Sequence, residues 1–141
     1  LAFLGAELQP GFELFARQAA LERRLRAADL VVTGEGAIDR STLMGKGVGR
    51  IAQSCRKLRI PCIGLAGMVS TKLEAGAFFT HAHALTELTT VAQAQARPAY
   101  WLARLARRVA ARKSEDRKPK PEGRPRTEIR KLSVLSCPTF G

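Results

Sequence analysis

Apolar residues recur at helical spacing after a Pro-Gly pair near the start of the chain, and then give way to short unbroken apolar runs. Leu14, Leu21 and Leu25 share one face at this spacing, which predicts an amphipathic helix. The run DLVVT at 29–33 is apolar and β-branched, as in a strand buried on both faces. The pattern therefore predicts a helix followed by a buried strand.

A second strand of the same kind follows after one further helix. Residues 48–58 (VGRIAQSCRKL) have helical spacing, with Val48, Ile51, Ala52 and Cys55 on the apolar face. The run CIGLAG at 62–67 then resembles the first strand in composition. Strand, helix and strand with short connections form a βαβ unit, which requires parallel pairing. The sequence thus predicts an α/β fold built from βαβ units with a parallel sheet.

The remainder of the chain divides near residue 112. We expect a helical turn in the STKLEAGA stretch, a third strand within 77–85, and helix over 91–112 with a kink or fresh start at Pro98. The segment 113–141 is rich in Lys, Arg and Pro, and most of it lacks apolar residues. Such a segment buries too little surface to offset its chain entropy. We predict one α/β region at 1–112 and a disordered basic tail at 113–141.

Composition narrows the class of protein only moderately. The chain has 141 residues and a formal net charge of +12, which attracts anions in general. No stretch approaches the length of a membrane span, and the first residues lack the basic and apolar regions of a signal peptide. The three cysteines include no CxxC pair, which argues against a disulfide framework and a zinc site. We expect reduced cysteines, a cytoplasmic location and no membrane partner.

The segment that follows the first strand concentrates glycine, hydroxyl and charged residues, and we expect it to form a loop. It matches neither the phosphate loop of the common NTPases nor the dinucleotide-binding fingerprint. Even so, Gly45, Gly47 and the backbone around them lead into a helix N-terminus, where N–H groups favour an anion. Lys46 is placed to neutralise a phosphate, and Glu35 or Asp39 to hold Mg²⁺ or to accept a hydroxyl proton. The structural alternative is that the glycines shape a turn, Asp39 caps it and Lys46 is solvated.

The stretch ADLVVTGEGAIDRSTLMGKG at 28–47, read from Ala28, resembles the motif of the type I glycerate kinases, which include bacterial glycerate 2-kinases. The flanking stretches LAFLGAELQPGFEL and IPCIGLAG resemble the family as well, so that the resemblance covers residues 1 to about 112. The matching positions are Asp29, Thr33, Gly34, Glu35, Gly36, Asp39, Thr42, Gly45 and Lys46.

The resemblance implies ATP-dependent phosphorylation of D-glycerate to 2-phosphoglycerate or 3-phosphoglycerate with Mg²⁺, on a fold of two α/β domains. It implies catalytic roles for Glu35, Asp39 and Lys46. The substrate- or phosphate-binding positions that it implies are Thr33, Gly34, Gly36, Thr42, Gly45 and Gly47, and no metal ligand is assigned beyond Glu35 or Asp39.

The chain departs from the family pattern in three ways. Ser41 stands where the family usually has Gln, the Pro common after Gly-Lys is absent, and the family's N-terminal opening motif is missing. The resemblance is therefore to the C-terminal part of a glycerate kinase. We expect this portion alone to be inactive, because about half of the active-site cleft should come from residues that it lacks.

Other chemistry-bearing residues favour ordinary structural roles. His81 and His83 alternate on a strand without further metal ligands nearby in sequence. Tyr100 and Trp101 are interpreted as packing residues, and the arginines at 104–112 as a solvated face. We expect small-molecule partners, D-glycerate and ATP, and no nucleic-acid partner. Two alternatives remain open at this point, a non-catalytic α/β module that binds an anion or nucleic acid, and a truncated product that does not accumulate.

Overall fold

A single parallel sheet forms the centre of the computed structural model, which describes residues 4–5, 8–70, 78–115 and 132–136. Its strands are β1 (Leu30–Ile38), β2 (Cys62–Val69), β3 (His81–Ala84) and β4 (Leu132–Ser136). The strand order is β3-β2-β1-β4, and all three neighbouring pairs are parallel. The predicted α/β class with a parallel sheet is confirmed.

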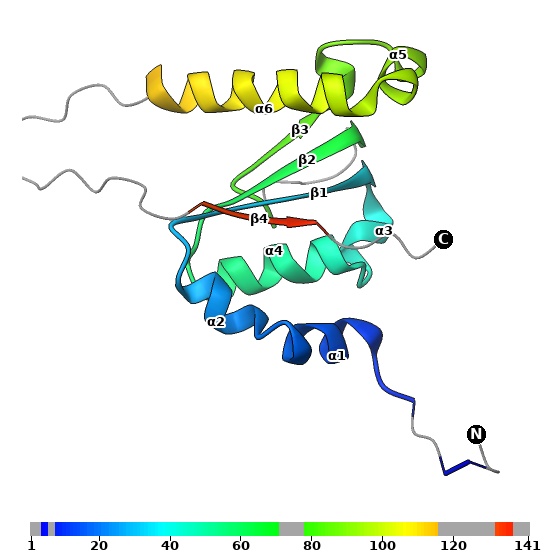
Figure 1. Cartoon of the computed structure of the whole chain (residues 1–141), viewed down its shortest axis with the longest axis vertical. Coiled ribbons are helices and arrows are strands. Elements are labelled where there is room, and N and C mark those ends of the chain that lie inside the picture. Colours follow the sequence, from blue (N-terminus) through cyan, green and yellow to red (C-terminus); the bar gives the residue numbers. More distant parts are fainter. Residues whose placement is uncertain (1–3, 6–7, 71–77, 116–131, 137–141) are drawn as a thin grey trace, which may run out of the picture.

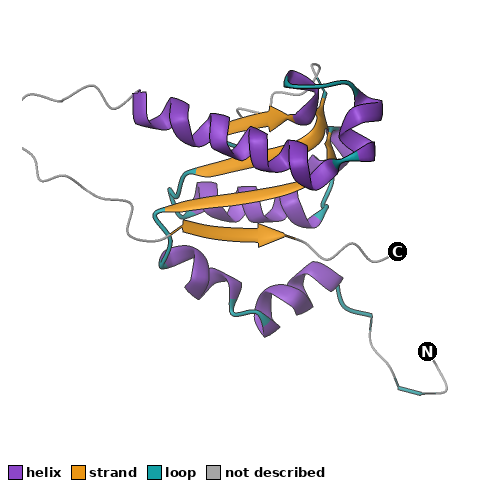
Figure 2. Ribbon diagram, turned by 45° about the horizontal axis from the view of Figure 1, so that its top comes forward, coloured by secondary structure: helices purple, strands orange, loops and turns teal. Residues whose placement is uncertain are grey.

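Helices cover both faces of this sheet (Figures 1 and 2). On one face lie α1 (Gly11–Gln18), α2 (Leu21–Arg26) and α4 (Gly47–Lys57). On the other face lie α5 (Val91–Ala96) and the long α6 (Pro98–Glu115), preceded by a single 3₁₀ turn at Leu85–Glu87. The short α3 (Arg40–Leu43) connects β1 to α4 at the carboxyl end of the strand. The predicted βαβ unit is β1-α4-β2.

The larger core lies between α4 and the sheet, where α2 also packs. The four residues predicted to form the apolar face of the helix after the glycine-rich segment are all buried in it, namely Val48, Ile51, Ala52 and Cys55. Leu21 and Leu25 of α2 and Val31 of β1 belong to the same core. A smaller cluster on the opposite face centres on Leu105 of α6. Two separate cores therefore hold the two helical layers on one sheet.

The N-terminal helix predicted from the leucine spacing is two helices. Ala20 adopts a left-handed backbone conformation with φ of 46°, which ends the first helix and re-aims the second. Leu14 is consequently 45% exposed, whereas Leu21 and Leu25 are buried. The prediction of one continuous apolar face was wrong at Leu14, because the break changes the direction of α1, so that Phe12 and Ala16 rather than Leu14 pack against the core that α2 contacts.

β1 is longer than the apolar run predicted, and the expected loop after Thr33 is wrong for Gly34 and Gly36. Both glycines lie within the strand, whose pairing with β2 continues to Ile38. A Cβ atom on Gly34 would lie 2.2 Å from the Leu65 carbonyl oxygen, and one on Gly67 would lie 2.6 Å from the Gly36 oxygen. At Gly34 and Gly67 glycine is needed because the two strands approach too closely for a side chain, and not because the chain turns, whereas a Cβ on Gly36 would meet nothing within 4 Å.

The later elements agree with the expectations except at the end of the chain. Pro98 is the first residue of α6, so the break predicted at this proline is confirmed, and β3 lies within the predicted 77–85. The helical turn expected after Ser70 lies outside the described residues, as does most of the 113–141 tail. At 113–115 the structure continues α6, and at 132–136 it forms β4 beside β1. Disorder is thus the wrong description for 132–136, a short run of strand-forming residues that follows the proline-rich part.

Candidate functional site

Glu35, Thr42 and Lys46 come together at the carboxyl end of β1. The Thr42 hydroxyl donates a hydrogen bond to Glu35 Oε1 at 2.5 Å, and Lys46 Nζ lies 3.8 Å from Glu35 Oε2. The Glu35 side chain is 17% exposed and that of Lys46 is 48% exposed. Both oxygens of one partly buried carboxylate are therefore engaged, one by a buried hydroxyl and the other by a cation that solvent reaches.

Asp39 organises the backbone between this strand and the lysine. It is the N-cap of α3, and its Oδ1 accepts hydrogen bonds from the Ser41 N–H at 2.8 Å and from the Ser41 hydroxyl at 2.5 Å. In return, the Asp39 N–H donates to the Thr42 hydroxyl at 3.2 Å. These bonds to Ser41, with a smaller contribution from the charge of Lys46, hold the pKa of Asp39 below its usual value. Asp39 is therefore ionised at neutral pH.

Thr42 links the Glu35 carboxylate to the Asp39 backbone through one buried hydroxyl. Its side chain is fully buried, donates to Glu35 and accepts from the Asp39 backbone. This placement shields the Thr42 hydroxyl from solvent and orients the partly exposed Glu35 carboxylate. The substrate- or phosphate-binding role expected for Thr42 from the sequence stays a prediction.

The two ends of the α3–α4 connection depend on glycine. Gly45 has φ of +120°, a conformation that L side chains rarely adopt. Gly49, in the first turn of α4, is packed so closely that a Cβ would lie 2.0 Å from the Thr42 carbonyl oxygen. Lys46 is the N-cap of α4 and Gly47 its first residue, so the lysine stands at the positive end of an eleven-residue helix.

Thr33 and the two strand glycines lie next to an apolar cavity of about 730 Å³ between β1, β2 and the α5–α6 layer. Glu35 also lines this cavity, which therefore adjoins the polar cluster. The Thr33 side chain is buried, and its hydroxyl has no hydrogen-bond partner within the described part of the chain. The apolar residues around the cavity include Leu65, Met68, Leu85, Val91, Ala94 and Leu102.

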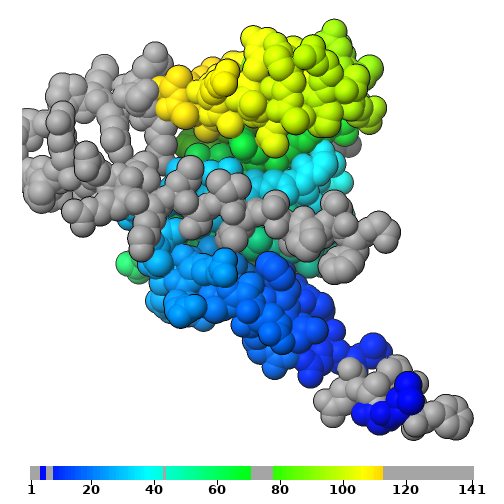
Figure 3. Space-filling view, in the orientation of Figure 1, coloured from blue at the N-terminus to red at the C-terminus, as the bar shows by residue number. Residues whose placement is uncertain are grey.

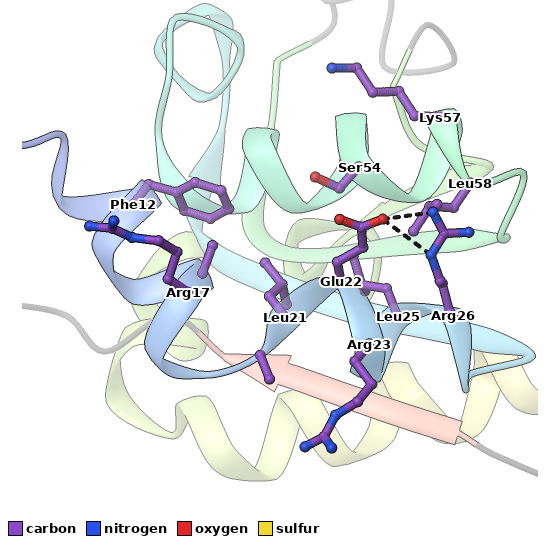
Figure 4. A pocket seen from close by; sticks show the side chains of 12 residues that line it. Phe12, Arg17, Leu21, Glu22, Arg23, Leu25, Arg26, Ser54, Lys57 and Leu58 are labelled. Carbon is purple, nitrogen blue, oxygen red and sulfur yellow. Dashed lines mark hydrogen bonds and ion pairs between the residues drawn. The ribbon is translucent and has the colours of Figure 1, made fainter.

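A second cavity, of about 710 Å³, lies between α1, α2 and α4 on the opposite face (Figure 4). Arg17, Arg23 and Lys57 line it but point in different directions, and Glu22 pairs with Arg26 at 2.6 Å. Its cations do not converge on one point, so this groove lacks the geometry of an anion site.

Mg²⁺ usually takes one or two protein carboxylates, and substrate phosphates and water supply its other ligands. Glu35 and Asp39, both oriented by hydrogen bonds, satisfy that small requirement. A metal site made of protein side chains alone would need more ligands. The described residues contain no group of three His, Cys, Asp or Glu side chains that could hold a metal ion. The donor set therefore fits a metal that arrives with a phosphorylated substrate.

The histidines and, within the described residues, the cysteines considered in the sequence lie away from the polar cluster, on β3 and in the larger core. His81 and His83 stack on one face of β3, and His83 Nδ1 lies 3.4 Å from Glu87 Oε1. Cys55 and Cys62 are buried core residues, as the sequence predicts, and the hydrogen bond with Cys55 together with burial raises the pKa of the Cys62 thiol. Across the described part of the chain, no helix is long and apolar enough to cross a membrane.

Sequence patterns identified Glu35, Asp39 and Lys46 but not their mutual arrangement. The sequence indicated Asp39 as a cap, since Asp is a favoured N-cap residue, but gave no signal for the bond that Thr42 returns to it. No sequence signal pairs Thr42 with Glu35, because α3 must first fold back over the end of β1.

Comparisons with known proteins agree on one family. The family model for glycerate kinases matches residues 1–114. The chain is 37% identical over 75 residues to the glycerate kinase of Halalkalibacterium halodurans, a match covering 53% of this chain and 20% of that protein. It is 40% identical over 70 residues to the glycerate 2-kinase of Escherichia coli, covering 50% of this chain and 18% of that protein. The matched segment thus spans about a fifth of the length of these curated relatives.

Proposed function

Because the chain belongs to the glycerate kinase family, we propose that it forms part of a kinase that transfers the terminal phosphoryl group of ATP to a hydroxyl group of D-glycerate. The observation that carries the proposal is the Glu35–Thr42–Lys46 cluster, which lies within the segment matched by the family. A cation, two ionisable carboxylates and a helix N-terminus meet there at one end of a parallel sheet, where α/β proteins bind ligands.

Lys46 is the residue that we propose contacts the transferred phosphoryl group. Its ammonium is half exposed and only loosely paired with Glu35 at 3.8 Å, so that a phosphate can replace or share this partner. Its position as N-cap directs the positive end of α4 to the same place. Preorganised positive charge of this kind stabilises the negative charge that gathers in phosphoryl transfer. The backbone of Gly45 and Gly47 continues the same anion-binding surface.

The Glu35 and Asp39 carboxylates have different roles in the proposed reaction. When the glycerate hydroxyl attacks phosphorus, the bond to ADP breaks and the hydroxyl proton must go to a base. The lowered pKa of Asp39 makes it a weak proton acceptor but a good partner for a cation. We therefore assign proton acceptance to Glu35, held by Thr42, and a contact with Mg²⁺ to Asp39. Mg²⁺, when bound, supplies charge neutralisation of the ATP phosphates.

The apolar cavity next to Glu35 fits the nonpolar part of the substrates. D-Glycerate and phosphates are wholly polar, so the adenine base is the group that gains from an apolar environment. The cavity volume of about 730 Å³ lies in the range of small-molecule sites. We place the base there, with Ala94 and Ala99 at its α5–α6 wall. On this proposal the enzyme acts in the cytoplasm, where ATP is abundant.

The test is a coupled ADP-release assay on two proteins. One is the 141-residue chain alone, which should show little or no turnover. The other is a chimaera in which residues 1–114, the part that the family model matches, replace the corresponding part of the Escherichia coli glycerate 2-kinase. This chimaera should release ADP only when both D-glycerate and Mg-ATP are present, and phosphorus NMR should then identify the product as 2-phosphoglycerate. A folded chimaera without turnover would refute the proposal, and 3-phosphoglycerate as product would correct the assigned hydroxyl.

A further inference from the structure

Helix α6 carries a surface that the kinase reaction does not use. Between Glu87 and Glu115 the sequence has no Asp or Glu, while five arginines lie in this stretch, at 97, 104, 107, 108 and 112. Four of the five are well exposed and Arg108 is partly exposed. None of the ion pairs that the structure forms within the described residues involves them. Residues 88–114 therefore carry five arginine charges that no ion pair within the described residues compensates.

The first two of these arginines lie beside two aromatic rings at the start of α6. The guanidinium of Arg97 lies 4.5 Å from the centre of the Tyr100 ring, and that of Arg104 lies 5.8 Å from Tyr100 and 5.3 Å from Trp101. The Arg104 guanidinium also donates to the Tyr100 hydroxyl at 3.4 Å. Arg108 and Arg112 continue the same face at spacings of four residues, about 6 Å per step along a helix. This stripe thus begins with guanidinium groups beside aromatic rings and continues with arginines alone.

The stripe is open to solvent on the outer layer of the molecule. Figure 3 shows α5 and α6 along one side of the molecule, above the sheet. Tyr100 is 43% exposed, while Leu105 on the inner side of the same helix is fully buried. The inner face of α6 thus accounts for its packing, and the arginine face is left for another purpose.

The row of arginines on α6 does not stabilise the helix. Arginines four residues apart on one helix repel each other, and each such pair costs the helix a few tenths of a kcal/mol. Arg104, Arg108 and Arg112 form two of these pairs in succession. Cations in the last turns do interact well with the helix dipole, but Arg104 lies in the first half of α6 and Arg97 directly precedes its first residue. An anionic partner that runs along the helix removes this repulsion.

Contrary to the expectation from the sequence of no nucleic-acid partner, we propose that an arginine stripe binds single-stranded nucleic acid without sequence preference. The stripe is formed by Arg97, directly before α6, and by Tyr100, Arg104, Arg107, Arg108 and Arg112 of α6. Guanidinium groups match phosphate oxygens in geometry, and an exposed aromatic ring between them offers a surface on which a base stacks. A basic stripe along one helix of a strongly basic chain, with a pI of about 10.8, is the electrostatic footprint of such binding. An acidic protein segment would satisfy the charges but leaves the exposed Tyr100 ring unused.

The test measures fluorescence anisotropy of a labelled oligo-dT with the full 141-residue chain across a range of salt concentrations. Replacing Arg104, Arg108 and Arg112 by Gln should weaken binding at least tenfold and reduce the slope of log affinity against log salt by about 2. The matched control replaces Arg23, Arg24 and Lys57 by Gln, three exposed cations elsewhere on the chain. This control changes the net charge equally and should bind within twofold to threefold of the unmodified chain.

Two further arms separate the partner classes. Tyr100→Leu should weaken binding of oligo-dT roughly tenfold and leave binding of an abasic oligonucleotide of equal length unchanged. Poly-glutamate of matched charge should compete poorly with oligo-dT. Equal losses in the α6 triple variant and its control would show unspecific charge attraction and overturn the proposal. Strong competition by poly-glutamate would overturn the nucleic-acid assignment in favour of an acidic protein. Circular dichroism should show the triple variant to be folded, since it relieves repulsion within α6.

Discussion

Replacing Gly49 by Ala sets two effects of known size against each other. In a helix, Ala is favoured over Gly by about 1 kcal/mol, so propensity alone predicts a more stable protein. The structure predicts the reverse, because the new Cβ would lie 2.0 Å from the Thr42 carbonyl oxygen and 2.9 Å from its carbonyl carbon. These are backbone atoms of α3, and they can yield only if α3 and α4 move apart. Overpacking of a tight site costs about 1–3 kcal/mol, and a backbone clash lies at the upper end of that range.

The expected net result is a loss of about 1–2 kcal/mol in the free energy of unfolding, which lowers Tm by roughly 5–15 °C for a domain of this size. Urea unfolding followed by circular dichroism measures the change directly. Gly11→Ala is the matched control, since Gly11 begins α1 and a Cβ there meets nothing within 4 Å. The control should be neutral or slightly stabilising. A Gly49→Ala protein as stable as the unmodified chain would refute the close contact between α3 and α4.

Three further predictions concern the polar cluster and the cavity. Thr42→Val keeps the shape of the side chain but removes the buried hydroxyl, and it should cost about 2–3 kcal/mol of stability in urea unfolding because a donor to a carboxylate is lost; an unchanged midpoint would contradict this bond. Asp39→Asn should be less stable than the unmodified chain above pH 5, and the difference should vanish on acidification. The sign follows from the pKa of Asp39, which folding lowers from 3.8, so that its stabilisation is present above that value and is lost as pH falls through the folded pKa; a difference that persists at pH 2 would be inconsistent with it. Ala99→Trp in the chimaera should raise KM for ATP with little change in kcat, since it fills the cavity wall assigned to the base; an unchanged KM would place the base elsewhere.

Local sequence patterns were sufficient to predict the helices and strands that bury one continuous apolar face. The helix containing Val48, Ile51 and Cys55 and the strand after Pro61 were predicted nearly to their ends, because periodicity and a proline mark them. The break at Ala20 carries no such mark, since alanine at a left-handed position has no sequence signal. Predictions from spacing therefore merged α1 and α2 into one helix.

The glycines show why the site was only partly predictable. Glycine is usually a sign of a turn, and for Gly45, with its positive φ, that interpretation holds. For Gly34 the constraint is the neighbouring strand, whose Leu65 carbonyl occupies the place of a side chain. Such a contact exists only once β1 and β2 are paired. The same applies to the bond between Thr42 and Glu35, whose partners meet only after α3 folds over the strand end.

The most direct test of the central claim is the kcat of the chimaera with Lys46→Ala beside that with Lys57→Ala, the exposed lysine at the other end of the same helix. If Lys46 stabilises the charge of the transferred phosphoryl group, its removal should lower kcat by roughly two to three orders of magnitude. Lys57→Ala should leave kcat unchanged, and Lys46→Arg should restore little, because a forked guanidinium does not replace a compact ammonium. A near-normal kcat for folded Lys46→Ala would contradict the account and reduce the cluster to a structural connection between β1 and α4.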